Sequence, residues 1–350
     1  MHIYDLDTPA VVIDVDVLEK NINDMAEHCK NLGITLRGHT KSHKNPEIAK
    51  MQVAAGSQGI VCQKLGDAEN MARAGLDDIL MTYNIVGKQK VRRLCALAKL
   101  RTMTVTVDSF ETAKGISDQA VEDNVTVGVL VEIDTGGNRT GVQSPAAAEE
   151  LGKHVNGLPG MKLRGLMTYP SSIASKPIVD ETVKRFGDAG LSLEIISGGG
   201  TGEEWESKEL GFTEHRSGSY VYEGLTRING SGDGSDLSPE RCPLRAVTTV
   251  VSVPTDDRLI VDAGMKTFRL FPDIPYGYII EDPDLKFSGM SVEHGQIDTS
   301  CSSKTYSVGD KLTVIPTYQE GVTNLHDEIV WMRHNQVERV FKNEGRGKVR

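Results

Sequence analysis

Residues 34–44 read Ile-Thr-Leu-Arg-Gly-His-Thr-Lys-Ser-His-Lys. The stretch begins with an apolar run typical of a buried strand and continues with basic residues. If the run is the first strand of a parallel barrel, Lys41 follows its carboxyl end and lies in the barrel mouth, where active sites of that fold are built. Partial burial and neighbouring cations would make Lys41 a nucleophilic amine suited to a Schiff base. The alternative is a basic turn that faces water or contacts an anion.

The same pattern, a short apolar run followed by polar residues and a helical window, recurs along the chain. Between most of the runs lie windows with helical periodicity, such as 64–74, 88–100, 109–121, 146–155 and 177–189. The candidate strands are 34–37, 59–62, 78–81, 102–107, 125–133, 162–167, 192–197 and 213–216.

Strands that alternate with helices, without a break for a second sheet, predict an α/β fold, a (β/α)8 barrel of the TIM type. A doubly wound open sheet is the alternative, because periodicity does not reveal topology. After about residue 228 the helical periodicity almost vanishes, and β-type runs follow at 245–253, 258–261, 276–280, 311–315 and 329–332. We interpret residues 14–235 as the barrel and residues 1–13 plus 236–350 as a C-terminal antiparallel β domain. The Gly- and Ser-rich stretch 230–235 predicts a loop or domain crossing.

Composition narrows the class of protein. The 350 residues suffice for a barrel of about 250 residues and a second unit. Lys plus Arg total 39 against 49 for Asp plus Glu, a net charge of −10, and no long basic stripe is present, so nucleic acid is not an expected partner. No apolar window reaches the length of a membrane span and no signal peptide is recognisable, so we expect a cytoplasmic protein with no membrane partner. The five cysteines are scattered, which argues against a disulfide framework and a zinc finger.

A glycine-rich stretch follows the predicted seventh strand and comprises Ser197, Gly198, Gly199, Gly200 and Thr201. Glycines allow backbone N–H groups to approach an anion closely, and the loops after strands seven and eight are the usual phosphate site of a barrel. The position therefore favours a phosphate over the alternative, a flexible turn.

Two further strand ends carry polar side chains. Glu132, Asp134 and Arg139 lie at the end of the fifth strand, where an arginine could hold a carboxylate or a ring oxyanion, although a structural salt bridge is the alternative. Tyr169 follows the sixth strand and could offer its hydroxyl group to a ring nitrogen, or could simply pack. Both interpretations stay open at this point.

Together these motifs resemble the fold-type III pyridoxal-phosphate enzymes, specifically the D-threonine aldolase and D-serine dehydratase group with its alanine-racemase-like barrel. Residues 37–44 are similar to the lysine motif of that group, Arg-Pro-His-x-Lys-Thr-His-Lys, with Gly38 and Ser42 as departures. The resemblance spans nearly the whole chain. Further matches are Gln63, 139–142, 218–220, 262–266 and 293–295.

The resemblance implies that pyridoxal 5'-phosphate is the cofactor, that Lys41 forms its Schiff base and that residues 197–201 bind its phosphate. Strand alternation would place His39, Lys41 and His43 on one face, so His39 is a candidate cofactor contact and His43 a candidate catalytic residue. A small amino-acid substrate and a homodimer are also implied. The other cofactor contacts that the resemblance implies are Gln63, Arg139, Tyr169 and Tyr220.

One motif departs from the family. Its members carry a His-x-Cys or His-x-Asp pair that binds a divalent ion, and the register set by Pro316 and Asn324 puts Tyr318 and Glu320 at these positions. Neither residue is a thiolate or imidazole ligand, so zinc is not expected. Glu320, with water, could still hold Mg²⁺ or Mn²⁺. Alternatively the metal is lost, and Tyr318 and Glu320 act as acid and base.

The expected function is that of a pyridoxal-phosphate-dependent lyase acting on a β-hydroxy or otherwise β-substituted D-amino acid. In β-elimination Lys41 would take or relay the Cα proton, whereas in retro-aldol cleavage Glu320 or Tyr318 would take the β-hydroxyl proton. One alternative is an amino-acid racemase or epimerase with Lys41 and Tyr318 as its two bases. The other is a non-catalytic protein that binds the cofactor on the same barrel.

Overall fold

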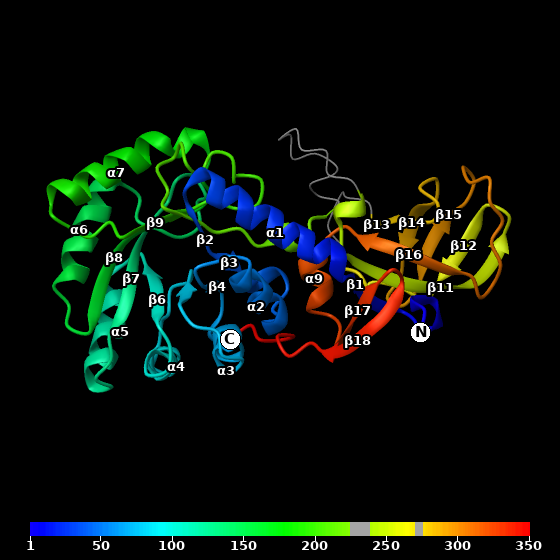
Figure 1. Ribbon diagram of the computed structural model, residues 1–350, viewed down its shortest axis with the longest axis horizontal. Helices are drawn as coiled ribbons and strands as arrows, with labels where there is room; N and C mark the ends of the chain where they lie inside the picture. The colour runs from blue at the N-terminus through cyan, green and yellow to red at the C-terminus, as the bar shows by residue number, and fades with distance from the viewer. Residues whose placement is uncertain (225–238, 270–275) are drawn as a thin grey trace. The chain divides into compact units, whose positions relative to one another are not determined.

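The structure, a computed structural model, describes residues 1–224, 239–269 and 276–350 (Figure 1). It divides into two compact units. The barrel unit comprises residues 23–41, 45–218 and 348–350, and the β unit comprises residues 1–22, 42–44 and 219–347. The predicted crossing at 230–235 and the predicted boundary between residues 235 and 236 lie outside the described residues.

The barrel unit is built on a parallel sheet in the order β2-β10-β9-β8-β7-β6-β5-β4-β3. Strands β2 and β3 are two halves of one stave on either side of Arg37, since β2 pairs with β10 and β3 pairs with β4. This pairing nearly closes the sheet. The predicted barrel is therefore confirmed, and the open-sheet alternative is wrong. The strands are β2 (Thr35–Leu36), β3 (Gly38–His39), β4 (Ile60–Cys62), β5 (Ile79–Met81), β6 (Met103–Val107), β7 (Val127–Ile133), β8 (Met161–Thr168), β9 (Ile195–Gly198) and β10 (Glu214–His215).

Helices follow most of these strands and bury their apolar sides against the sheet. Side chains such as Met71, Leu94 and Phe186 pack with strand residues such as Ile60 and Val105 in one continuous core. Several helices begin at a capping side chain, which satisfies a backbone N–H that the helix itself leaves free. The helices are α1 (Val15–Leu32), α2 (Pro46–Ala54), α3 (Leu65–Arg73), α4 (Lys88–Ala98), α5 (Phe110–Glu122), α6 (Pro145–Asn156) and α7 (Lys176–Asp188).

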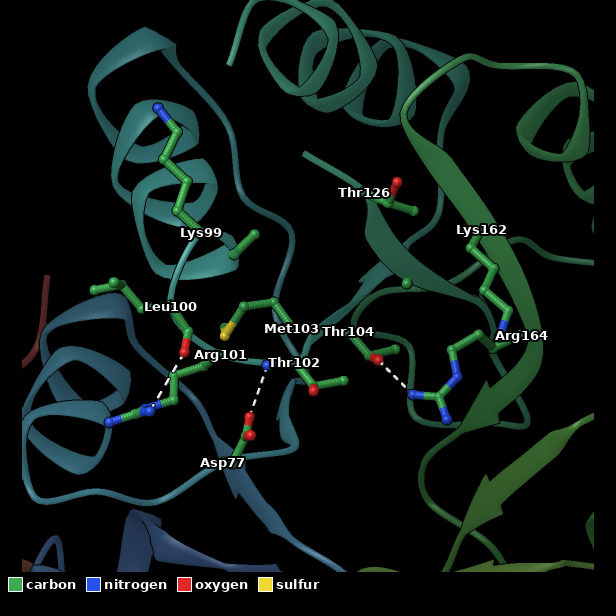
Figure 2. A pocket seen from close by; sticks show the side chains of 12 residues that line it. Asp77, Lys99, Leu100, Arg101, Thr102, Met103, Thr104, Thr126, Lys162 and Arg164 are labelled. Atoms are coloured by element: carbon green, nitrogen blue, oxygen red, sulfur yellow. Dashed lines mark hydrogen bonds between the residues drawn. The ribbon is translucent and has the colours of Figure 1, made fainter. Parts of the chain in front are cut away.

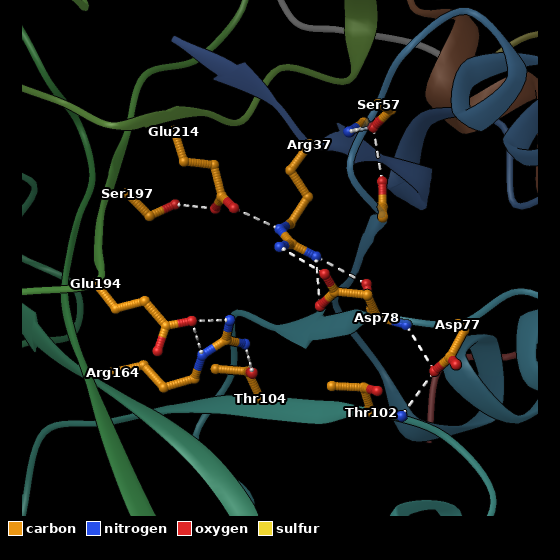
Figure 3. A network of polar contacts seen from close by, with 12 residues as sticks. Arg37, Ser57, Asp77, Asp78, Thr102, Thr104, Arg164, Glu194, Ser197 and Glu214 are labelled. Atoms are coloured by element: carbon orange, nitrogen blue, oxygen red, sulfur yellow. Dashed lines mark hydrogen bonds and ion pairs between the residues drawn. The ribbon is translucent and has the colours of Figure 1, made fainter.

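A buried ion-pair network fills the gap in the split stave (Figure 3). Arg37, 1% exposed, donates from Nε to Glu214 over 2.6 Å and from Nη1 to the carbonyl oxygen of Asp78 over 2.8 Å. Ser197 donates its hydroxyl hydrogen to the other oxygen of Glu214 over 2.6 Å. Gly59 makes room for the guanidinium group, because a Cβ there would lie 2.6 Å from Nη1 of Arg37. The buried cation thus joins three staves and has carboxylates on both sides.

The β unit contains a mostly antiparallel sheet in the order β14-β15-β12-β11-β1-β17-β18, with β16 and β13 branching from β11. Strand β1 pairs antiparallel with β11 and parallel with β17, so the predicted participation of the first strand is confirmed. Its strands are β1 (Ala10–Asp14), β11 (Leu244–Thr255), β12 (Arg258–Val261), β13 (Gly277–Ile279), β14 (Lys286–Met290), β15 (Gly295–Asp298), β16 (Lys311–Pro316), β17 (Glu328–Arg333) and β18 (Gln336–Lys342).

The β unit has its own core, in which Val250, Leu259, Ile297 and Val314 from four strands pack together. A short helix, α9 (Gln319–Thr323), follows β16 and begins directly after Tyr318. In the part of the chain that the structure describes, no helix is long and apolar enough to cross a membrane.

Candidate active site

Lys41 lies just beyond the end of β3, in a single turn of 3₁₀ helix, η2 (Thr40–Ser42). The lysine side chain is exposed, so the predicted partial burial is wrong. The strand ends at His39 and the turn carries the chain outward, so the strand alternation expected through His43 does not continue. His43 is instead fully buried, in the β unit.

His39 is held in a chain of hydrogen bonds across three neighbouring strand ends. Its Nδ1 accepts the backbone N–H of Lys41 over 3.3 Å, and its Nε2 lies 3.1 Å from Oε1 of Gln63. Gln63 in turn donates to the carbonyl oxygen of Thr82 over 2.9 Å. Because Nδ1 is an acceptor, Nε2 carries the hydrogen, and the imidazole orientation next to Lys41 is fixed.

The loop after β7 presents Arg139 to Tyr169. Asp134 accepts backbone hydrogens from Gly136 and Gly137 over 2.9 and 2.7 Å, which holds the loop in a tight turn. The guanidinium carbon of Arg139 lies 5.0 Å from the ring centroid of Tyr169, a cation–π distance. Two residues that the sequence indicated separately, at different strand ends, are therefore brought together.

The glycine-rich stretch lies at the end of β9, next to Tyr169. Its backbone is tightly packed, because a Cβ on Gly198 would lie 2.2 Å from Phe212 and one on Gly200 would lie 3.2 Å from Tyr169. Gly199 has φ +82° and donates its N–H to Ser171 over 2.9 Å. The hydroxyl of Ser197 donates its hydrogen to Glu214 inside the barrel. The stretch is thus a close-packed loop rather than a loose turn, and the role of residues 197–201 in phosphate binding stays a prediction.

Sequence reasoning did not single out Arg216, which lies directly after β10 and is 5% exposed. One Nη donates to the carbonyl oxygen of Thr168 over 2.6 Å. Among the described residues, the Nε of Arg216 and the hydroxyl of the buried Ser217 have no hydrogen-bond partner. Burial lowers the pKa of Arg216. Only the fold reveals this group, because in the sequence it is one arginine after a short strand.

Glu203 is a second residue that the sequence did not indicate. It belongs to the loop after β9, and burial raises its pKa to about 7. A Cβ on Gly200 would lie 3.5 Å from Oε2 of Glu203, so the carboxyl group borders the glycine-rich stretch. A group that titrates near neutrality beside a buried arginine is typical of a functional site.

The carboxyl ends of the barrel strands therefore hold an exposed amine, an oriented imidazole, an arginine over a tyrosine ring, and buried polar atoms without partners. Buried polar groups normally find a partner, so the atoms of Arg216 and Ser217 point to a polar ligand. A primary amine, cationic groups and hydroxyl groups suit a small anionic aldehyde with a ring. The residues present fit pyridoxal 5'-phosphate.

The β unit carries a separate polar cluster around Glu320. Ser42 and Ser219 each donate a hydroxyl hydrogen to Oε1 over 2.7 Å, and Tyr318 donates to Oε2 over 3.0 Å. Burial and the nearby carboxylate raise the pKa of Tyr318 to about 12. Tyr220, the last cofactor contact predicted from the sequence, lies next to Ser219 in η4 (Ser219–Val221) and is 1% exposed.

A cavity of about 500 Å³ lies at the opposite ends of the strands, where β6, β7 and β8 begin (Figure 2). Its cationic side chains already have partners: Lys99 pairs with Asp123, and both Lys162 and Arg164 pair with Glu194. In barrels this end serves stability rather than catalysis. We therefore place the candidate active site at the other end.

Known proteins share this architecture. Residues 13–225 match the family described as the alanine racemase N-terminal domain, and residues 243–332 match a serine dehydratase domain family. A D-threonine aldolase from Arthrobacter sp. is 31% identical over 98% of this chain and 93% of its own length. A 3-hydroxy-D-aspartate aldolase from Paracoccus denitrificans has the same identity and coverage.

Solved structures agree with these sequence matches. The crystal structure of D-threonine aldolase from Filomicrobium marinum aligns with a TM-score of 0.92 and 29% identity, covering 99% of this chain and 97% of that chain. D-threo-3-hydroxyaspartate dehydratase from Delftia sp. HT23 aligns with a TM-score of 0.87 and 25% identity over 98% of both chains. A cysteine-to-alanine mutant of that dehydratase was solved in a metal-free form.

The barrel with a lysine after its first stave, joined to a β unit, defines the architectural class of alanine racemase and its relatives. Within that class, the chain belongs to the D-threonine aldolase and D-serine dehydratase-like family.

Proposed function

We propose that this protein is a pyridoxal-phosphate-dependent lyase that acts on β-hydroxy D-amino acids. The observation that carries the proposal is the match over nearly the whole chain to relatives named as aldolases and a dehydratase of such amino acids. The placement of Lys41 directly after β3 supports it, because barrel enzymes carry their reactive groups at the carboxyl ends of the strands.

The barrel unit would hold the cofactor. Lys41 would bind it covalently and Tyr169 would face its ring nitrogen, with His39 and Gln63 fixed beside the lysine by their hydrogen bonds. Residues 197–201 and Arg139 would receive its phosphate and ring oxygen, and Tyr220 is a further proposed contact. When bound, the cofactor supplies a conjugated ring that spreads negative charge developing at Cα.

The remaining chemistry consists of proton movements by the chain's own residues. The amine of Lys41 can take the proton from Cα, and the imidazole of His39 keeps the neighbouring backbone of Lys41 in place through its Nδ1. His43 stays a proposed catalytic residue. Glu320 is the candidate acceptor for the proton of the β-hydroxyl group, and Tyr318, which donates its own hydrogen to Glu320, stays a proposed catalytic residue.

The racemase alternative is less well supported. It requires Tyr318 to act as a base, but the phenol of Tyr318 donates its hydrogen to Glu320 and has a pKa raised to about 12. A phenol with that pKa is almost wholly protonated at neutral pH and cannot accept a proton. The alanine racemases among the structural neighbours are 17% identical or less, which supports the shared fold alone.

We also propose that the protein works as a homodimer in the cytoplasm, and that residues 14–235 are the functional barrel domain. Five cysteines that form no disulfide bond, four of them buried, suit a reducing compartment. Light scattering of the purified protein tests the dimer, which a monomeric mass at working concentration would contradict.

The experiment that tests the function begins with reduction of the cofactor-loaded protein by borohydride and peptide mass spectrometry. We expect the cofactor mass on Lys41. The unreduced protein is then offered D- and L-amino acids with and without a β-hydroxyl group, and aldehyde, ammonia with keto acid, and inverted amino acid are measured separately. Release of aldehyde or keto acid from β-hydroxy D-amino acids is expected, whereas inversion without fragmentation would contradict the proposal.

A further inference from the structure

Glu320 lies at the centre of a hydroxyl cluster, which we define as Ser42, Ser219, Tyr318 and Glu320. Oε1 of Glu320 accepts hydrogen bonds from Ser42 and Ser219, and Oε2 accepts one from Tyr318; these donors are neutral hydroxyl groups. Ser42 is fully buried and Ser219 is half-buried. Converging donors of this kind stabilise negative charge on a carboxylate and fix its orientation.

The hydroxyl cluster does not fit a divalent metal ion. Mg²⁺ and Mn²⁺ are held by several oxygens with free lone pairs, often from more than one carboxylate. Here the hydroxyl groups of Ser42, Ser219 and Tyr318 direct their hydrogens toward Glu320. Among the residues that the structure describes, no group of three or more His, Cys, Asp or Glu side chains could hold a metal ion. Hydrogen bonds to the carboxylate instead keep Glu320 ionised and oriented, which is the form that can accept a proton.

Covalent geometry ties the cluster to the reactive lysine. Ser42 follows Lys41 in the chain, and consecutive Cα atoms are about 3.8 Å apart. The side chain of Ser42 donates to Glu320, and its carbonyl oxygen accepts the hydroxyl hydrogen of Thr323 over 3.1 Å. Helix α9 therefore holds both the main chain and the side chain of the residue after the lysine.

We propose that Glu320, oriented by Ser42, Ser219 and Tyr318, removes the proton of the substrate's β-hydroxyl group without the help of a metal ion. This inference rests on the proposed function and assigns it to retro-aldol cleavage. The O–H bond of the substrate breaks and an O–H bond to Glu320 forms. The β-oxygen becomes the carbonyl oxygen of an aldehyde as the Cα–Cβ bond breaks, and the electron pair of that bond stays with Cα. Cα takes a proton and Glu320 returns one to water, so no proton is consumed.

The test of Glu320 uses two reactions of the cofactor-loaded enzyme. Cleavage of a β-hydroxy D-amino acid needs the proposed base, whereas exchange of the α-proton of glycine with D₂O does not. We expect Glu320→Gln to slow cleavage by about 10²- to 10⁴-fold and to leave glycine exchange and the cofactor spectrum unchanged. Equal loss of both reactions, or full cleavage activity in the variant, would overturn the proposal.

Ser42 and Tyr318, which orient Glu320 in the proposal, have matched controls in the same unit. Asp282 accepts hydroxyl hydrogens from Ser302 over 2.6 Å and from Tyr306 over 2.7 Å, which reproduces the chemistry of the hydroxyl cluster at another carboxylate. We expect Ser42→Ala and Tyr318→Phe each to slow cleavage about tenfold, with Ser42→Thr restoring the rate. Ser302→Ala and Tyr306→Phe should leave it unchanged. If the variants at Ser42 and Tyr318 and those at Ser302 and Tyr306 slow cleavage equally, the hydroxyl cluster has only a structural role.

Metal independence is measured on the protein itself. Calorimetric titration with Mn²⁺ and with Zn²⁺ should show no stoichiometric binding, and EDTA should leave cleavage unchanged. Tyr318→His combined with Glu320→Cys should gain a zinc site. Stoichiometric Mn²⁺ binding that disappears in Glu320→Gln, or inactivation by EDTA, would overturn the inference while aldehyde release still upholds the lyase function. Absence of any product from all β-hydroxy D-amino acids would instead overturn both.

Discussion

The polar groups at the two ends of the barrel strands differ in whether they have hydrogen-bond or ion-pair partners. At the amino ends, the charged side chains around the cavity of Figure 2 are paired with each other or with backbone groups. At the carboxyl ends, buried atoms of Arg216 and Ser217 lack partners among the described residues. A buried polar atom without a partner costs about 1–3 kcal/mol. The comparison indicates that a ligand binds at the carboxyl ends, where buried polar atoms lack partners in the described part of the chain, even though a cavity of about 500 Å³ lies at the amino ends.

The largest effect should come from Lys41, because it supplies the reactive amine of the carboxyl end. In Lys41→Ala we expect no covalent cofactor and no detectable turnover, measured by peptide mass spectrometry after borohydride reduction and by product release. Lys99→Ala, at the amino-end cavity, is the matched control and should keep full activity. Residual turnover in the first variant, or its loss in the second, would reverse the assignment of the two ends.

Removal of Arg37 tests the network that joins the staves. Arg37→Ala leaves Glu214 and Asp78 without their cation, so we expect the free energy of unfolding in urea to fall by about 3–5 kcal/mol. Arg164→Ala removes a partly exposed pair with Glu194 and should cost less than about 1 kcal/mol. Similar losses in both variants would mean that burial does not set the strength of these pairs.

Substitution of Arg216 tests how much a buried polar group without a complete set of partners among the described residues contributes to ligand binding. A hydrogen bond to a charged group contributes about 1.5–3 kcal/mol, so Arg216→Met should weaken cofactor binding by about 10- to 100-fold in a spectroscopic titration. Arg101→Met, which replaces an arginine at the amino-end cavity, should bind the cofactor normally. Unchanged affinity in the first variant would remove Arg216 from the site.

Glu203 should make the free energy of unfolding depend on pH. Its pKa in the folded protein, about 7, lies above the ordinary value of 4.5. Between these values the folded state keeps a proton that the unfolded state has lost, so the free energy of unfolding falls as the pH rises through this window. Glu203→Gln should remove that fall. Relative to the original protein, the variant should gain about 1–2 kcal/mol in the free energy of unfolding at pH 8 compared with pH 4, after allowance for the partial exposure of Glu203. Urea unfolding at both pH values measures it, and parallel curves for the two proteins would count against the assignment.

Much of the barrel could be predicted from the sequence, because each stave combines an apolar run with a following helix. The β unit was predicted less completely. Strands β14, β15 and β18 were missed, since β14 and β18 are largely exposed, β15 is buried only at alternate positions, and residues such as Gly289, Gln296 and Glu338 interrupt an apolar pattern. Their pairing depends on partner strands rather than on their own composition.

The candidate site was also predicted in part. Motif spacing was enough to select Lys41, Tyr169 and Arg139, because each follows a strand that the sequence reveals. Arg216 could not be selected, and Ser219 stood out only as part of the matched stretch 218–220, because burial and contact with a residue far along the chain give them their importance. The hydrogen bond from Ser42 to Glu320 spans 278 positions, and no local pattern encodes it.

Residues 42–44 belong to the β unit, although the residues on both sides of them belong to the barrel unit. The two parts of the molecule are therefore not interchangeable modules. A chimaera that joined this barrel to the C-terminal part of another family member would need an acceptor for the Ser42 hydroxyl hydrogen and a donor for the Ser42 carbonyl oxygen. In recombination experiments within this family, the residues at positions 42, 320 and 323 should therefore all come from the same parent protein.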